Sequence, residues 1–484
     1  MNKSFKLWTK TLLLILFLFN ATLHSNASKK YPQEKHFGFV TRSADKLMEN
    51  GKELRFIGMN TPNLHIQEDK SFLTENWHRV NEFEIRDIFE TIRQMGGTVT
   101  RTYVFSVVGG SNNPTQKSHI NALRKYDEDL FRDFDLVLKL ANEYQIRLIV
   151  PFIDNWDWWG GTKQLAAFRG KEKSEFCSDS LVKADYKHLI NFVLNRRNTL
   201  TGVLYKNDPA ILAWETGNEL GIENAHGNAQ EFDAWTLEMA SYIKTIDKNH
   251  LVNDGKDCYR YGLSDEQIKN PYVDMVTDHY YWGDYVAACA KSREKCKGKK
   301  VFYVGEFNHE KIDIHDKLFQ EVLSDGTSGA LVWSLRFHAN DGGFYFHSEK
   351  ADASNPCYRW PGFSSSNTNE FNKMQQVRSF AYLIRGLKEP AMPKPQAPYL
   401  IPESTPSQLR WRGSAGATSY LLERKTQKNS PWVILDAKAL EDAIPYTPYV
   451  DKSAEKGLKY YYRLKAENQS GLSEFSNIIG PVLF

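Results

Sequence analysis

The stretch AILAWETGNEL, from Ala210 to Leu220, begins as an apolar run and ends in an amide and a carboxylate, Asn218 and Glu219. Strands buried in a parallel sheet read as continuous apolar runs, and barrel enzymes place their reacting groups at the carboxyl ends of such strands. The stretch therefore predicts a buried strand that carries functional side chains at its end. The alternative is a strand followed by an ordinary hydrophilic loop.

Seven further strand-like segments lie between about residues 54 and 335, and AILAWET is the fourth of the eight. The others read LRFIGMN, TVTRTYV, IRLIVPF, HLVNDG, VDMVTDHYY, VFYVGEF and GALVWSL. Helical patterns lie between most of them, as in residues 82–97 and 128–145, where apolar residues recur every three or four positions. Eight strands alternating with helices predict an α/β fold, a (β/α)8 TIM barrel.

A doubly wound open sheet is the alternative architecture. Its main functional use is phosphate binding, which requires a glycine-rich loop after the first strand. The corresponding segment, GMNTPN (residues 58–63), has neither the glycine spacing nor the lysine of such a loop. The barrel is therefore the preferred prediction.

The segments on either side of the barrel predict the domain boundaries. The turn Glu49-Asn50-Gly51 separates two strand-like runs and predicts a hairpin at the bottom of a barrel domain spanning residues 28–388. Residues 389–398 are rich in proline and predict a stiff linker. Residues 399–484 alternate in strand-like fashion, which predicts a small all-β immunoglobulin-like sandwich.

The stretch YYYRLKAENQSGLSEFSN (residues 460–477) resembles the end of a fibronectin type III module. The resemblance implies that Tyr460 forms the tyrosine corner and that Trp411 lies in the core of the sandwich. Because no exposed aromatic platform is evident, we expect a spacer or docking role, with sugar binding as the alternative.

The first 27 residues predict a secretory signal peptide. Lysines at positions 3, 6 and 10 precede the apolar run 12–19, and Ser25-Asn26-Ala27 supplies a cleavage site after Ala27. We therefore expect a protein that is secreted, periplasmic or on the cell surface, with an uncleaved anchor as the alternative. Since no other apolar run approaches twenty residues, we expect no membrane association after cleavage.

Charge and cysteine content restrict the partners. A net charge of +3 over 484 residues, without a concentrated basic face, argues against nucleic acid binding, and we expect a monomer. The five cysteines are odd in number. Cys289 and Cys296 are close enough in sequence to close one loop, whereas Cys177, Cys258 and Cys357 have no assigned partner. Free buried thiols are the alternative.

A barrel brings the carboxyl ends of its strands together, and two acids stand at such ends. Glu219 follows the fourth strand and Glu306, in VFYVGEF, lies at the end of the seventh. A single acid at a strand end is more often structural. Two acids after apolar strands cost free energy if they are buried without partners, so the pair indicates a functional site. Glycoside hydrolysis requires such a pair, one carboxyl to protonate the leaving oxygen and one to attack the anomeric carbon.

Several motifs together resemble glycoside hydrolase family five, and within it the endo-β-1,4-mannanases. The motifs are NRRNTLTGVLYKNDPAILAWETGNEL, DHYYW, FYVGEFN and GALVWSLRFHANDGGFYFHSE, and the similarity covers roughly residues 36 to 385. The resemblance implies that Glu219 is the acid/base and Glu306 the nucleophile, with an internal β-mannosidic bond of mannan, glucomannan or galactomannan as the target.

The resemblance also implies roles for seven further side chains that would bind substrate or support the acids. Arg101 would hold Glu306 ionised and lower its pKa. Asn218 would bind the sugar's 2-hydroxyl, His279 would join the acid/base network and Tyr281 would orient Glu306. Asn155, Trp156 and Trp333 would contact the sugar. For each of these residues the alternative is ordinary packing.

The chemistry implied by the resemblance needs no cofactor and no metal. His338, Asp341 and His347 suggest metal ligands, but their spacing is not that of a zinc site. Leu220-Gly221 departs from the family pattern of proline, often followed by arginine, after the acid/base residue. That departure puts in doubt the contact that such an arginine would make in the leaving-group subsite. A family-five cellulase or an exo-β-mannosidase on the same scaffold is the nearby alternative, and a non-catalytic polysaccharide-binding protein is the alternative from another class.

Overall fold

The eight predicted strands are present and form one parallel sheet. The computed structural model describes residues 38–74, 77–111, 117–221, 226–256, 262–308, 311–347, 357–363, 369–441 and 446–484. The strands pair in the order β4-β13-β12-β11-β10-β9-β8-β5. Their bounds are β4 Phe56–Met59, β5 Val99–Arg101, β8 Arg147–Pro151, β9 Ile211–Glu215, β10 Leu251–Asp254, β11 Met275–Tyr280, β12 Val301–Phe307 and β13 Gly329–Val332.

The two ends of this sheet meet beside β4 and β5. Asn60, which follows β4, forms a parallel bridge with Arg101, the last residue of β5. The backbone N–H of Thr61 donates to the carbonyl oxygen of Arg101 at 2.9 Å. The sheet is therefore nearly closed as a barrel, in agreement with the predicted (β/α)8 fold.

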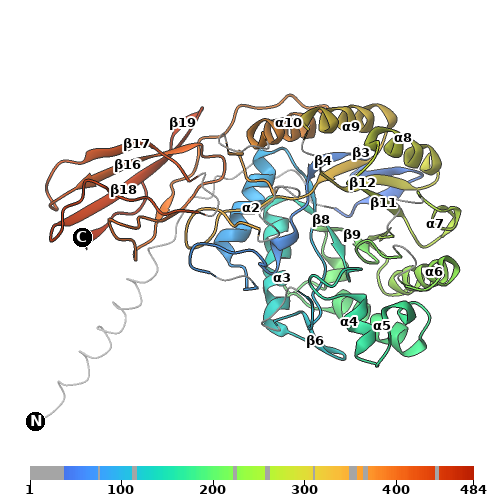
Figure 1. Cartoon of the computed structure of the whole chain (residues 1–484). Coiled ribbons are helices and arrows are strands. Elements are labelled where there is room, and N and C mark those ends of the chain that lie inside the picture. Colours follow the sequence, from blue (N-terminus) through green and yellow to red (C-terminus); the bar gives the residue numbers. More distant parts are fainter. Residues whose placement is uncertain are drawn as a thin grey trace, which may run out of the picture. The chain divides into compact units, whose positions relative to one another are not determined.

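Helices follow the barrel strands along the chain and surround them (Figure 1). They are α2 Glu82–Gln94, α3 Glu128–Tyr144, α4 Thr162–Ala167, α5 Ser180–Asn195, α6 Ala229–Ile246, α7 Asp265–Lys269, α8 Tyr285–Cys296, α9 Ile312–Asp325 and α10 Glu370–Leu383. Local sequence fixes their starts. Asn81 and Glu84 form a reciprocal capping box at α2, and Asp127 accepts hydrogen bonds from two backbone N–H groups at the start of α3.

The predicted hairpin lies at the amino-terminal end of the barrel. Strands β1 (Thr41–Ser43), β2 (Lys46–Glu49) and β3 (Lys52–Leu54) form an antiparallel sheet. Its second turn has positive φ at Asn50 and Gly51, the conformation of a type I′ turn. Leu47 of β2 belongs to one buried cluster with first residues of barrel strands, Phe56, Val99, Leu251, Met275 and Val301. The hairpin thus covers the bottom of the barrel.

The C-terminal segment forms antiparallel sheets. Strands β16 (Ser419–Lys425), β17 (Val433–Ala439), β18 (Lys459–Asn468), β19 (Gly471–Leu472) and β20 (Ile479–Leu483) form one sheet, and β14 (Tyr399–Leu400) pairs with β15 (Trp411–Arg412). Trp411 is fully buried in the core of this segment. The hydroxyl of Tyr460 accepts a hydrogen bond from the backbone N–H of Glu455 at 2.8 Å, the contact expected of a tyrosine corner.

Residues Gly38–Phe484 form one compact unit, in which the loop after β13 touches the C-terminal segment. His338 in that loop lies between two buried acids. Its Nδ1 is 2.9 Å from Asp87 of α2, and its Nε2 is 2.9 Å from Glu441, which follows β17. Two chain regions distant in sequence are therefore joined through one imidazole.

Cys289 and Cys296 are both buried and free. Both lie on α8, and seven residues of helix advance the chain by about 10 Å. That is more than the Cα separation of about 7 Å at which a disulfide can form. The predicted pairing is therefore wrong, and Cys177 and Cys357 are also free.

Two sequence predictions concern residues outside the described ranges, the signal peptide (1–27) and Cys258. Among the helices that the structure describes, none is long and apolar enough to cross a membrane.

Candidate active site

The predicted acids come from opposite parts of the barrel sheet and meet at its carboxyl end. Glu306 lies within β12, whereas Glu219 lies four residues beyond the end of β9. One side-chain oxygen of each glutamate and one ring nitrogen of His279 all lie within 4.8 Å of one another. The predicted proximity of the two carboxylates is therefore confirmed.

Glu306 is held by two short hydrogen bonds. Its Oε1 accepts from Nη1 of Arg101 at 2.6 Å, and its Oε2 accepts from the hydroxyl of Tyr281 at 2.6 Å. Both donors were predicted, and Arg101 is completely buried. These two contacts fix the orientation of the Glu306 carboxylate, because each of its oxygens is held by a different donor.

Arg101 is shared with a second buried acid, which sequence reasoning missed. Its Nε and Nη2 bind the two oxygens of Glu215 at 2.9 and 2.6 Å, and Nη2 also donates to Oδ1 of Asn218 at 2.7 Å. Glu215 is the last residue of β9 and is fully buried. The signal that drew attention to the other acids, a carboxylate closing an apolar strand, applies equally to Glu215.

Asn218 is held on both sides. Besides accepting from Arg101, its Nδ2 donates to Oδ1 of Asp154 at 3.0 Å, and the hydroxyl of Tyr103 donates to Oδ2 of Asp154 at 2.7 Å. Burial raises the pKa of Asp154 to about 7. The Asp154–Asn218 contact was not predicted, because it joins the loops after β8 and β9.

Glu219 is positioned by a ring on each side. Its Oε1 is 2.8 Å from Nδ1 of His279, and its Oε2 accepts from the indole N–H of Trp156 at 2.5 Å. The backbone of Glu219 has φ of 51°, the left-handed region, which costs an L-residue roughly 1–2 kcal/mol. Such strain is typical of functional sites.

The pKa of Glu219 and that of Glu306 shift in the directions opposite to those expected of an acid/base residue and a nucleophile. Burial raises the pKa of Glu306, and the charges of His279 and Arg101 do not fully offset that effect. Burial also raises the pKa of Glu219, but the hydrogen bonds from His279 and Trp156 and the charge of His279 outweigh it, so the net direction is downward. Arg101 lowers the pKa of Glu306 as expected, but burial outweighs its charge, so the net direction is upward.

His279 explains where the proton of the site resides. Burial lowers the pKa of His279, but the charges of Glu306 and Glu219 outweigh it and raise the pKa to about 9. Nδ1 also lies 3.7 Å from Oε2 of Glu306, so one nitrogen faces both acids. Nε2 is buried and has no hydrogen-bond partner among the described residues. At neutral pH His279 is therefore protonated, with its Nδ1 facing both acids.

The remaining predicted residues differ in their exposure. Trp333 follows β13, is half-buried, and its ring meets that of Tyr103 edge-on at a centroid distance of 5.7 Å. Trp156 is 44% exposed. Asn155 is buried, and neither polar atom of its side chain has a hydrogen-bond partner among the described residues. Its predicted contact with substrate stays a prediction.

The three residues of the loop after β13 that suggested metal ligands are separate anchors. His338 binds Asp87 and Glu441, as described above. Asp341 accepts hydrogen bonds from the hydroxyl of Ser71 and the backbone N–H of Leu73 at 2.9 and 2.7 Å. His347 joins a third set of partners. His338, Asp341 and His347 therefore attach the loop after β13 to three different sets of partners.

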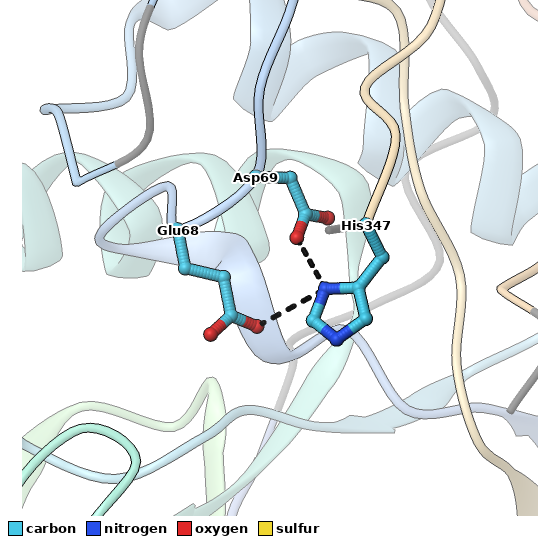
Figure 2. A group of neighbouring side chains, drawn as sticks. All are labelled: Glu68, Asp69 and His347. Carbon is cyan, nitrogen blue, oxygen red and sulfur yellow. Dashed lines mark hydrogen bonds and ion pairs between the residues drawn. The ribbon is translucent and has the colours of Figure 1, made fainter. Parts of the chain in front are cut away.

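Figure 2 shows His347 beside Glu68 and Asp69, two acids of the loop after β4. Nδ1 of His347 is 2.5 Å from Asp69, and the guanidinium of Arg336 also binds Asp69. The indole N–H groups of Trp158 and Trp159 both donate to Oε2 of Glu68, at 2.5 and 2.6 Å. Because a guanidinium and two indole N–H groups already bind these acids, the cluster is better suited to supporting the loop after β8, which carries Trp158 and Trp159, than to binding a cation.

Comparisons with known proteins identify the family of this chain. A family model described as GH family 5 beta-mannosidase-like matches residues 37–288. Putative mannan endo-1,4-beta-mannosidase P from Arabidopsis thaliana is 31% identical over 258 residues, covering 52% of this chain and 59% of the relative. Mannan endo-1,4-beta-mannosidase 4 from Solanum lycopersicum is 33% identical over 266 residues, covering 50% and 62%. The matches thus span less than two thirds of either relative.

Solved structures support the fold. The X-ray structure of the endo-beta-1,4-mannanase from Thermotoga petrophila superposes with a TM-score of 0.58 at 21% identity, covering 88% of this chain and 98% of that chain. Since the family model matches more than half of the 484 residues, the chain belongs to glycoside hydrolase family 5, in its β-mannosidase-like group.

Proposed function

We propose that this chain is a retaining endo-β-1,4-mannanase that cleaves internal bonds of mannan, glucomannan or galactomannan. The observation that carries the proposal is the pair of carboxylates on β12 and after β9, with oxygens within 4.8 Å of each other. Retaining glycosidases place their two carboxyl groups about 5–5.5 Å apart, whereas inverting enzymes leave a wider gap for water.

Glu306 serves as nucleophile in this proposal. Arg101 and Tyr281 aim its carboxylate, and its oxygen attacks the anomeric carbon to form a glycosyl ester while Glu219 protonates the departing oxygen. Water then attacks the ester with Glu219 as base. Trp333, exposed in part beside Tyr103, offers its ring face to the sugar at the cleaved bond. No cofactor takes part in these steps.

The same proposal includes export and a fibronectin type III-like C-terminal module. Export rests on the charged, apolar and small-residue parts of residues 1–27. The module rests on the buried Trp411 and on the Tyr460 hydroxyl contact with Glu455. We expect a spacer or docking role for it and a monomeric enzyme whose macromolecular partner is the polysaccharide.

A panel of substrates tests the proposed activity. We expect reducing ends to be released from mannan and glucomannan and not from carboxymethylcellulose. Glu306→Gln should lower kcat/KM by about 10⁴-fold or more, because attack is lost. Glu219→Gln should lower it by about 10²- to 10⁴-fold, because acid assistance is lost. Wild-type rates in Glu306→Gln would refute the assignment.

An exo-acting β-mannosidase is the second candidate, favoured by the family model's description. The products of mannohexaose separate the two. Mannobiose, mannotriose and mannotetraose at early times indicate internal cleavage, whereas mannose and mannopentaose alone indicate cleavage from an end.

A further inference from the structure

We propose that Asp154 is a positioning residue that aligns two sides of the subsite at the cleaved bond, the amide of Asn218 and the ring of Tyr103. The inference rests on the proposed function and deepens it. Asp154 lies in the loop after β8, and its side chain is fully buried. Its two carboxyl oxygens face different partners, one on each side of the subsite.

The first oxygen of Asp154 fixes the amide of Asn218. Nδ2 of Asn218 donates to Oδ1 of Asp154 at 3.0 Å, while Oδ1 of Asn218 accepts from Nη2 of Arg101 at 2.7 Å. Turning the amide over would break both contacts, since its oxygen would face a carboxylate and its nitrogen a guanidinium. The other contact of Nδ2, 3.5 Å to the hydroxyl of Tyr103, is at the limit of a hydrogen bond. One N–H of the amide is therefore available to the sugar's 2-hydroxyl.

The second oxygen of Asp154 fixes Tyr103, on the side of the aromatic platform. The hydroxyl of Tyr103 donates to Oδ2 of Asp154 at 2.7 Å. The ring of Tyr103 meets that of Trp333 edge-on at a centroid distance of 5.7 Å and that of the buried Trp159 at 5.0 Å. Such edge-to-face contacts depend on the angle between the rings. Trp333 thus packs against a ring whose direction Asp154 sets.

The surroundings of Asp154 suit a positioning role. The donors that reach its carboxyl group are Asn218, Tyr103 and the backbone N–H of Trp156, all of them neutral. Neutral donors offset the cost of burying a carboxylate less than a cation does, so this position indicates a function rather than a contribution to stability. Hydrogen bonds to the 2-hydroxyl strengthen in the transition state. We therefore expect Asp154 to act on the rate through that hydroxyl.

Removing the hydroxyl from the substrate tests this role. The probes are 2,4-dinitrophenyl β-mannobioside and its analogue that lacks the 2-hydroxyl on the ring at the cleaved bond. Asp154→Leu keeps a branched side chain but removes both acceptors. It should lower kcat/KM on the complete substrate by about 10²- to 10³-fold, and the loss on the 2-deoxy analogue should be at least about tenfold smaller.

The matched control is Asp154→Asn. Its side-chain oxygen still accepts from Asn218, and its N–H group can donate to the hydroxyl of Tyr103, which is also an acceptor. We expect kcat/KM on the complete substrate to stay within about tenfold of wild type. A loss in Asp154→Asn as large as that in Asp154→Leu would contradict a role that depends on these two hydrogen bonds.

A double variant covers the case in which Asp154→Leu does not fold. Combining it with Tyr103→Phe removes the hydroxyl that would otherwise be left buried without an acceptor, and replacing both partners of a hydrogen bond by apolar groups is better tolerated. The same difference between the two substrates is expected.

Equal losses on both substrates, in either variant that lacks the carboxyl group, would reduce Asp154 to a structural role and overturn the inference. That result leaves the proposed function intact as long as Glu306→Gln and Glu219→Gln remain impaired on mannan. If those two variants are active, the proposed function fails instead.

Discussion

Glu219 combines backbone strain with two side-chain hydrogen bonds. Its positive φ turns the side chain toward His279 and Trp156, which bind one carboxylate oxygen each. The sequence could locate this acid and Glu306, because both stand at the ends of apolar strands. It could not give their pKa directions, which depend on burial in the closed barrel and on His279, Arg101 and other side chains that distant parts of the chain bring beside the two acids.

At the residue scale, we predict that Glu215→Gln weakens catalysis without touching substrate. The change keeps the shape of the side chain but removes a charge that binds Arg101 through both oxygens. Arg101 is then free to shift from Glu306, so kcat on mannan should fall by about 10- to 100-fold with little change in KM. Steady-state kinetics measure this.

The control for Glu215→Gln is Glu84→Gln, which alters another buried glutamate, at the start of α2. We expect it to change stability and to leave kcat within about twofold of wild type. An equal fall in kcat for both variants would assign the effect to general destabilisation.

The loops after β9 and β10 meet through a backbone contact that accounts for the family departure at residue 220. The backbone N–H of Leu220 donates to the carbonyl oxygen of Gly255 at 3.0 Å, and Leu220 is fully buried. Proline has no N–H to donate. A Cβ at Gly255 would lie 1.5 Å from the carbonyl oxygen of Gly217, so only glycine permits this approach of the loops. Sequence patterns locate the elements, whereas such contacts between loops depend on the closed barrel.

At the element scale, we predict that Leu220→Pro lowers both stability and activity, although proline is the family's usual residue. The variant leaves a buried carbonyl oxygen without its donor, at a cost of about 1–3 kcal/mol. It also disturbs the backbone of Glu219, the preceding residue. Chemical denaturation and mannan assays test this.

The control is Leu220→Ala, which retains the N–H and loses only apolar packing. We expect its kcat to stay closer to wild type than that of Leu220→Pro. A Leu220→Pro enzyme as stable and active as wild type would show that the contact with Gly255 is dispensable.

At the scale of the whole molecule, the order of strands was predictable and the attachment of the C-terminal segment was not. The eight apolar runs and the prolines at 389–398 are local signals. The contact of His338 with Asp87 and Glu441 joins residues separated by 251 and 103 positions, which no local pattern encodes. His338, Asp341 and His347 attach this loop at three separate points, a role that the sequence did not indicate.

We predict that this attachment gives the protein a pH-dependent stability. Burial lowers the pKa of His338, but Asp87 and Glu441 outweigh it and raise the pKa to about 10. Since the unfolded value is near 6.5, the stabilisation is complete below about pH 6.5 and is lost as the pH rises through 10. His338→Gln should destabilise the protein by roughly 3–5 kcal/mol at pH 6 and by less at pH 10.

Calorimetry of wild type and His338→Gln between pH 6 and 10.5 measures that difference, since effects of other groups are common to both proteins. A constant difference in unfolding free energy across the range would contradict the assigned role of His338.

The most direct measurement of the proposed chemistry is to trap the enzyme with 2-deoxy-2-fluoro-β-mannosyl fluoride and to map the label by peptide mass spectrometry. A retaining enzyme with Glu306 as nucleophile predicts one fluoromannosyl group on the peptide that contains Glu306. A label on Glu219, or turnover by inversion with no label on either acid, would contradict it.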